Sequence, residues 1–329
     1  MSKYLKLLEK FKGKKVIVLG DFILDEYLYG ETERISREAP VLILRHRKSV
    51  YLAGGGANPI MNIKDLGGEP LPVSVAGNDV YSKTLIDMIR SKGVDTSHII
   101  RDSRYSVPVK TRVMAGSVHT VKQQVVRIDR VPEETPPKDL EDTFIETILS
   151  AAKTADTMLV SDYDSGIVTD RVIKCVNELA AKGLKVIVDS RHALKKFRNV
   201  TTGTPNETEA GPLVGVEKYG EKDVELTGKK LAKAVKSKGM IITRGSRGMM
   251  VFEGKKVMKV APYGGDEIVD VSGAGDTVSS IVTLAVSCGA SLYDAAFLAN
   301  LGGGIVVMKR GVATVSPNEL KGAIKRVKT

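Results

Sequence analysis

The chain has 329 residues, 42% of them hydrophobic but only 5% aromatic, with no tryptophan and a formal net charge of +11. This length and aliphatic composition are typical of an α/β enzyme with one main domain, and they argue against a surface that stacks single-stranded bases. The basic residues are dispersed along the sequence. They form either a solvated surface or a field that attracts anions, among which phosphorylated metabolites fit as well as nucleic acid.

The cysteines, histidines and apolar runs bear on the location of the protein. Cys175 and Cys288 lie far apart in apolar helical patterns, which is typical of buried thiols in a reducing compartment. The four histidines have no metal-ligand spacing, which argues against a zinc site. No apolar run reaches the roughly 20 residues of a membrane span, and the N-terminal segment lacks a signal-peptide core. We therefore expect a cytoplasmic protein.

The first half of the chain predicts a buried strand and a separate small sheet. After a short amphipathic helix within residues 1–15, the apolar run Val16–Leu19 predicts the first strand of the main sheet, and it ends in Gly20-Asp21. Two short strands separated by the polar segment Glu31–Glu38, and a later pair, are expected to form the small sheet. These strands are Ile23–Tyr29, Val41–His46, Val107–Met114 and Val121–Ile128. A second glycine-rich helix start lies at Gly54–Asn58.

The second half alternates helices and strands. The predicted linker is Pro132–Pro137, and the elements that follow it alternate as parallel βαβ units do. They are Leu140–Ala152, Thr157–Ser161, Thr169–Lys182, Lys185–Asp189 and Met240–Thr243. A hairpin is expected at Met249–Phe252 and Lys256–Val260, and two helices, Thr277–Cys288 and Leu292–Met308, are expected to be the last.

The turn Gly273-Ala274-Gly275-Asp276 stands where the apolar helix Val278–Cys288 begins. Glycines let backbone N–H groups close around an anion, and the helix start adds partial positive charge. We interpret Asp276 as the group that takes a proton from a substrate hydroxyl while the turn holds the phosphoryl group in transfer. The alternative is a glycine-rich loop whose Asp stabilises the helix dipole, and the local motif does not decide between them.

Three further motifs each have two interpretations. Asn206 and Glu209 could organise Mg²⁺ through its waters, or they could form a capping box. The turn Thr243–Gly248 could admit a nucleotide, or it could be an ordinary turn. The cluster Asp162–Asp164 could contact a substrate at the sheet edge, or it could be the acidic start of a helix. No Walker phosphate-binding pattern occurs in the sequence.

The order of these motifs resembles the ribokinase-like (PfkB-type) carbohydrate kinase family over almost the whole chain. The motifs are Gly20-Asp21, Gly54-Gly55, Pro205–Glu209, Thr243–Gly245 and Gly273–Asp276. The resemblance implies a three-layer α/β fold with a central, mostly parallel sheet flanked by helices and a small β lid over the sugar site. It implies one kinase domain over residues 1–329, with the lid from about 22–52 and 105–130, and a homodimer through the lid without nucleic-acid or membrane partners.

By the same resemblance, the protein is an ATP-dependent sugar kinase with Mg²⁺ as cofactor. Asp276 is then the catalytic base, and the anion hole is built by Gly273, Ala274 and Gly275. The residues implied for ATP are Asn206, Thr243, Gly245 and Asn300, and those for Mg²⁺ are Asn206 and Glu209. The residues implied for the sugar hydroxyls are Asp25, Gly54, Gly55 and Asn58.

Within the family, the segments Leu24–Tyr27 and Glu33–Val41 are similar to the heptose-7-phosphate kinases of ADP-heptose synthesis. This similarity implies that the acceptor is D-glycero-β-D-manno-heptose 7-phosphate, phosphorylated at its anomeric hydroxyl to the 1,7-bisphosphate. Arg34 could anchor the 7-phosphate, or it could form a surface salt bridge.

Two positions depart from the heptose kinases. Ser165 and Arg191 stand where those kinases usually carry lysine, and Arg does not replace Lys neutrally at a phosphate contact. No nucleotidyltransferase module follows Thr329, so we expect any nucleotide activation of the sugar to belong to another protein. The alternatives are a kinase for another sugar, sugar phosphate or nucleoside, and a non-catalytic protein that binds anions or nucleic acid.

Overall fold

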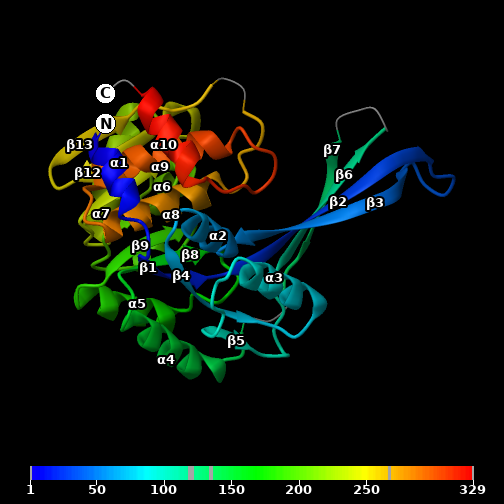
Figure 1. Ribbon diagram of the computed structural model, residues 1–329, viewed down its shortest axis with the longest axis horizontal. Coiled ribbons are helices and arrows are strands. Elements are labelled where there is room, and N and C mark those ends of the chain that lie inside the picture. The colour runs from blue at the N-terminus through cyan, green and yellow to red at the C-terminus, as the bar shows by residue number, and fades with distance from the viewer. Residues whose placement is uncertain (1, 118–121, 133–135, 266–267, 328–329) are drawn as a thin grey trace.

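The computed structural model describes residues 2–117, 122–132, 136–265 and 268–327. Its centre is a parallel sheet in the order β10-β9-β8-β1-β4-β5 (Figure 1). The strands are β1 (Lys15–Gly20), β4 (Glu69–Ala76), β5 (Ile99–Arg101), β8 (Thr157–Asp162), β9 (Lys185–Ser190) and β10 (Thr202–Gly203). The apolar run Val16–Leu19 of β1 is fully buried, because β1 lies inside the sheet and helices cover both faces.

Helices form the outer two layers. On one face of the sheet lie α2 (Ala57–Asp65) and α8 (Ala274–Ser287), and on the other lie α4 (Leu140–Ala152) and α5 (Asp170–Ala181) (Figure 1). Helix α9 (Leu292–Val306) packs on α8, so that α8 is buried from Asp276 to Ser287. The expected three-layer α/β fold is therefore confirmed.

A second sheet projects from this body in the order β3-β2-β6-β7 (Figure 1), and we call it the lid. Its strands are β2 (Phe22–Ile35), β3 (Leu42–Gly55), β6 (Val109–Gly116) and β7 (Gln123–Arg130). The pairs β2/β3 and β6/β7 are antiparallel, whereas β2/β6 is parallel. The first residues of β2 are buried in the body and the last are exposed, so the sheet runs outward from the root of the fold.

The lid strands are longer than predicted. The polar segment Glu31–Glu38 was expected to separate two short strands, but β2 continues to Ile35 and pairs with β3 as far as Leu42. Polar side chains are tolerated there because this part of the sheet is largely exposed. Val121 of the expected fourth strand and residues 133–135 of the expected linker lie outside the described residues.

A third sheet corrects the expected parallel alternation. Strand β11 (Gly239–Thr243) pairs antiparallel with β12 (Met249–Glu253), which pairs with β13 (Lys256–Val260). The chain reverses between β11 and β12 at Gly248, whose φ of 78° suits glycine. An isolated parallel bridge between Asn206 and Thr243 links this sheet to the segment that follows β10.

Several helices complete the fold. As expected, α1 (Ser2–Glu9) forms near the N-terminus, and α3 (Val80–Ser91) follows β4. Helix α6 (Glu207–Leu213) begins at the capping box that was one of the two interpretations of Asn206 and Glu209, whereas two later helices, α7 (Glu221–Ala234) and α10 (Pro317–Arg326), were not predicted. Helix α10 starts with a capping box of Ser316 and Glu319 and with Pro317 at its first position, which is a signal that the sequence carries.

The expectations about membrane spans and about the two cysteines can be compared with the structure. Within the described ranges, none of the helices is both long and apolar enough to cross a membrane. Cys175 is buried as expected, but Cys288 is only partly buried, and its thiol donates to the main-chain oxygen of Lys10. Cys288 lies at the end of α8, where the helix emerges from the core.

The contact between α8 and α9 generates a stability prediction. A Cβ atom at Gly302 of α9 would overlap the fully buried side chain of Ile281 on α8. Gly302→Ala should therefore lower the free energy of unfolding by about 1–3 kcal/mol in urea denaturation. Gly322→Ala on α10, where the nearest atom is the end of Arg326 at 3.7 Å, should raise it by up to about 1 kcal/mol. Equal effects of the two substitutions would contradict the close helix contact.

Candidate active site

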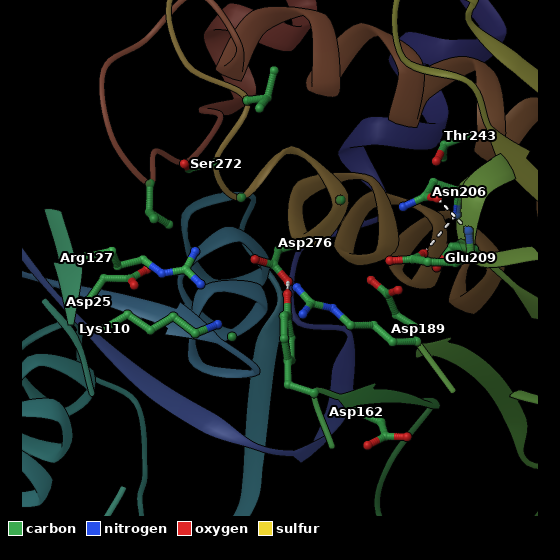
Figure 2. Close-up of a pocket in the computed structure, with 18 of the residues that line it drawn as sticks. Asp25, Lys110, Arg127, Asp162, Asp189, Asn206, Glu209, Thr243, Ser272 and Asp276 are labelled. Carbon is green, nitrogen blue, oxygen red and sulfur yellow. Dashed lines mark hydrogen bonds between the residues drawn. The ribbon is translucent and has the colours of Figure 1, made fainter. Parts of the chain in front are cut away.

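A cavity of about 370 Å³ lies where the carboxyl ends of β8 and β9, the start of α8 and the root of the lid meet. Figure 2 shows its side chains converging on Asp276 from these elements. The polar and charged residues that line it include Asp25, Lys110, Arg112, Arg127, Asp162, Tyr163, Asp189, Arg191, Asn206, Glu209, Thr243, Ser272 and Asp276. Parallel sheets place their strand ends at one edge, which explains how segments distant in sequence reach one cavity.

The start of α8 has the geometry of an anion site. Gly273 precedes the helix with a φ of 76°, and a Cβ atom there would lie 2.5 Å from the Asn58 amide nitrogen, so this position requires glycine. Among the described residues, the N–H groups of Gly275 and Asp276 have no hydrogen-bond partner, whereas that of Thr277 donates to the Gly273 oxygen. These two donors face a cavity at a positive helix end, which fits a phosphate group.

Asp276 itself is 5% exposed and is held by two donors. Asn58 Nδ2 donates to its Oδ2 at 3.0 Å, and the Tyr163 hydroxyl donates to its Oδ1 at 2.7 Å. Burial raises the pKa of Asp276 to about 6, and the hydrogen bonds from Asn58 and Tyr163 oppose that shift. A carboxylate with this pKa is ionised at neutral pH and still basic enough to accept a proton.

Asp25 brings a second carboxylate to the cavity from the buried start of β2. Arg112 of β6 donates to it at 2.5 Å, which neutralises its charge. A Cβ atom at Gly54 would overlap this carboxylate, and one at Gly55 would meet the Ile23 side chain at 2.7 Å. The two glycines therefore allow β3 to approach Asp25 closely. Of the four residues implied for the sugar hydroxyls, Asp25 and Gly55 line the cavity, whereas Gly54 and Asn58 are not among its lining residues.

Four cations of the cavity were not among the predicted site residues. Lys110, Arg112 and Arg127 come from the lid, and Arg191 follows β9. Lys110 lies 5.3 Å and Arg191 4.9 Å from the centre of the Tyr163 ring, and neither has an ion-pair partner among the described residues. Lys110 and Arg112 alternate along a strand of period two, which is a signal that could have found them.

Asn206, Glu209 and Thr243 also line the cavity. The first two form a capping box at the start of α6: Asn206 Oδ1 accepts from the Glu209 N–H at 2.9 Å, and Glu209 Oε2 accepts from the Asn206 N–H at 3.0 Å. Glu209 Oε1 has no partner among the described residues, so the cap leaves one carboxylate oxygen for a hydrated cation. Within the described part of the chain, no three or more His, Cys, Asp or Glu side chains are grouped so that they could hold a metal ion directly.

Asp189 is a further carboxylate that the sequence did not assign. Burial raises its pKa well above the usual range, and the charges of Asp276 and Glu209 raise it further. A raised pKa disfavours the ionised form of Asp189, so a cation bound beside it would favour ionisation.

Other predicted residues lie outside this cavity. Arg34 is exposed and pairs with Ile43 far along β2, because that strand extends to Ile35. Gly245 forms a turn after β11 with a φ of 54°, and Asn300 on α9 donates to the main-chain oxygen of Ala261 at 2.8 Å. Ala274 begins α8 behind the turn, partly buried.

The predicted alternatives for two motifs can now be compared with contacts. Tyr163 of the Asp162–Asp164 cluster contacts Asp276, and the N-cap of α5 is Thr169, so this cluster is part of the cavity rather than a helix start. The Ser165 N–H donates to the buried carboxylate of Asp21 at 3.2 Å. Arg191 occupies the cavity beside Tyr163, where it is available to an anion.

Comparison with solved structures shows a common fold. Phosphofructokinase-2 from Escherichia coli in complex with substrates and products superposes with a TM-score of 0.77 over 95% of this chain and 98% of that chain, at 18% identity. Ribokinase from Arabidopsis thaliana complexed with ribose and ATP has a TM-score of 0.71 over 96% of this chain and 100% of that chain, at 20% identity.

Sequence comparison gives nearer relatives. The bifunctional protein HldE of Nitratiruptor sp. is 34% identical over 93% of this chain, and that of Geobacter metallireducens is 35% identical over 94%. The chain spans 64% and 62% of the length of these two relatives. Residues 14–319 match the pfkB family of carbohydrate kinases, a range that includes the lid, the α8 turn and every residue of the cavity. The chain therefore belongs to the pfkB family of carbohydrate kinases, which transfer a phosphoryl group to a sugar hydroxyl.

Proposed function

We propose that this sugar kinase transfers the γ-phosphoryl group of ATP to the anomeric hydroxyl of D-glycero-β-D-manno-heptose 7-phosphate. The observation that carries the proposal is the buried carboxylate of Asp276 at the α8 N-terminus, which shares a cavity with Asp25 and four cations. The heptose acceptor is supported by the segments Leu24–Tyr27 and Glu33–Val41 and by the identity with the HldE proteins.

The chemistry requires one proton transfer and one phosphoryl transfer. Asp276 accepts the proton of the acceptor hydroxyl while that oxygen forms a bond to the γ-phosphorus. The bond from the γ-phosphorus to the bridging oxygen of ADP breaks in line, and ADP leaves. The N–H groups of Gly275 and Asp276 hold the charge of the group in transfer, and the proton on Asp276 returns to solvent.

The nucleotide would lie on the opposite side of the α8 turn from the lid. Asn206 and Thr243 border the phosphates, and Asn206 and Glu209 would hold Mg²⁺ through its waters. When bound, the ion neutralises phosphate charge. A neighbouring cavity of about 550 Å³ is lined by Arg244, Lys259 and Ala261, the last of which accepts the Asn300 hydrogen bond. This arrangement supports the assignment of Gly245 and Asn300 to the nucleotide side.

The acceptor would lie on the lid side, where cationic side chains can match the negative charge of its phosphate. Asp25, Gly54 and Gly55 would contact sugar hydroxyls, and Arg127 of β7 would hold the 7-phosphate. We assign this role to Arg127 in place of Arg34, because Arg34 is exposed on the distal part of β2, outside the cavity.

The outer part of the lid supports a homodimer. Its exposed apolar side chains include Ile35, Val41, Leu42, Val125, Val126 and Ile128, each between 46% and 65% exposed. Apolar side chains gathered on a projecting sheet gain free energy when a second copy covers them.

The first test removes the base. Asp276→Asn keeps the shape of the side chain but cannot accept the proton, so kcat should fall by about 10²–10⁴-fold in an ATP-coupled assay. Asp294→Asn is the matched control, because Asp294 is another buried carboxylate but lies on α9 outside the cavity. Asp276→Asn with undiminished kcat would show that another group is the base.

The second test is the pH dependence of kcat/KM. Because Asp276 must be ionised, the rate should fall about tenfold per pH unit below its pKa of about 6. Burial raises the pKa of both Asp276 and Asp21 to about 6, so their protonation in this range favours the folded state and cannot explain the loss by unfolding. A rate that stays constant down to pH 5 would contradict the assignment.

The third test concerns the acceptor. Arg127→Met should raise KM for heptose 7-phosphate about tenfold or more, with KM for ATP unchanged. Arg130→Met on the same strand is the control, because Arg130 contacts Tyr81 and Thr111 outside the cavity. Turnover of another sugar in a panel, without turnover of heptose 7-phosphate, would exclude the proposed acceptor while leaving the kinase assignment in place.

A further inference from the structure

A chain of buried polar side chains lies behind Asp276 and links α8 to α2. The Thr277 hydroxyl donates to Asn62 Oδ1 at 3.1 Å, and Asn62 Nδ2 donates to Asn58 Oδ1 at 3.0 Å. Asn58 Nδ2 then donates to Asp276 Oδ2 at 3.0 Å. Thr277, Asn62 and Asn58 are each 1% exposed or less, so water does not compete for these bonds. Asn62 and Thr277 do not line the cavity, and the proposed function assigns them no role.

A main-chain oxygen, which can only accept, determines the direction of every hydrogen bond among these buried side chains. The main-chain oxygen of Asn58 can only accept, and it lies 3.2 Å from the terminal amide atom of Asn62, which must therefore be nitrogen. The same nitrogen contacts the amide atom of Asn58 that must be oxygen. The remaining amide atom of Asn58 is then nitrogen, and it faces Asp276. A longer contact of 3.4 Å from this nitrogen to the Gly273 oxygen has the same direction.

We propose that Asn62, oriented by Thr277, is a positioning residue that forces Asn58 to present an N–H donor, and not its oxygen, to the proton-accepting carboxylate of Asp276. This inference rests on the proposed role of Asp276 as base. An Asn58 side chain turned by 180° would place an oxygen against the carboxylate and disfavour its ionised form. Asn62 therefore acts on the reaction through Asn58, although it touches neither substrate.

The other charged and titratable groups around Asp276 show why a fixed donor from Asn58 matters for its ionisation. The titratable and charged groups that face this carboxylate are Tyr163 after β8, Asp25 on β2, Lys110 on β6 and Asp189 on β9. The Tyr163 hydroxyl also lowers the pKa of Asp276, but it can rotate to accept from the protonated carboxyl group, so it excludes that form less strictly than a fixed N–H donor does. Asn58, once its amide is fixed, can only donate. It thus favours the ionised carboxylate against burial and the nearby acidic groups.

The experiment measures the ionisation of Asp276 directly in the full-length protein. Aspartate labelled with ¹³C at the side-chain carboxyl is titrated by NMR, and the Asp276 signal is assigned by its absence in Asp276→Asn. Asn62→Leu removes the donor to Asn58 with little change in volume, and the pKa of Asp276 should rise by about one unit. The acid limb of kcat/KM should move upward equally, so that kcat/KM at pH 5 falls about tenfold, whereas KM for ATP should not change.

Two further variants keep the test decisive if Asn62→Leu fails to fold. Thr277→Val removes only the first donor of the chain and should shift the titration in the same direction by a smaller amount, whereas Thr277→Ser retains the hydroxyl and should titrate like the wild type. Ser280→Ala is the control for a lost hydrogen bond at the same helix contact, because its hydroxyl donates to the main-chain oxygen of Asp276 and not to the carboxylate. It should leave the titration unchanged.

The outcomes separate this inference from the proposed function. If folded Asn62→Leu and Thr277→Val both titrate like the wild type while Asp276→Asn is inactive, the positioning role is wrong and the base assignment stands. If Asp276→Asn retains its kcat, the base assignment fails, whatever the titrations show. The positioning role is supported if the pKa of Asp276 rises in both Asn62→Leu and Thr277→Val. In Thr277→Ser and Ser280→Ala it should stay unchanged.

Discussion

Burial of a carboxylate at the N-terminus of α8 is the constraint on which the rest of the structure depends. Removing Asp276 from water disfavours its charge, so the fold must supply donors that keep it ionised. Those donors come from two distant segments: Asn58 on α2 and Tyr163 at the end of β8. The parallel sheet places both beside α8, because α2 and α8 share one face and β8 ends at the edge where α8 begins. The three-layer fold is thereby coupled to the ionisation of one side chain.

The cavity separates two electrostatic tasks around this carboxylate. On the lid side, Lys110, Arg112 and Arg127 bring positive charge from β6 and β7 to the cavity, where it can match the charge of a phosphorylated sugar. On the other side lie the carboxyl groups of Glu209 and Asp189, and a cation that accompanies a nucleotide would favour the ionised form of Asp189. The free N–H groups of the α8 turn lie between the two sides. This order of charges fits the proposed transfer from a nucleotide to a phosphorylated sugar.

The sequence predicted the layers and the α8 turn well because both depend on local patterns. The apolar run of β1 and the glycines before Asp276 have few alternative structures. The lid was harder to predict, because the length of a strand with polar residues depends on its partner. Because β2 extends further than predicted, Arg34 lies outside the cavity. The pairing of β6 and β7 with this sheet, which brings their cations to the cavity, was not predicted in detail either. The Asn62 chain could not be predicted at all, since it depends on the packing of α2 against α8.

The structure of the protein bound to heptose 7-phosphate and a non-hydrolysable ATP analogue tests the central claim most directly. The proposed mechanism predicts that the anomeric oxygen lies within about 2.6–3.2 Å of an Asp276 carboxylate oxygen, with the γ-phosphate at the N–H groups of Gly275 and Asp276. An acceptor whose reactive hydroxyl faces another group, with Asp276 still closed off by Asn58 and Tyr163, would contradict it.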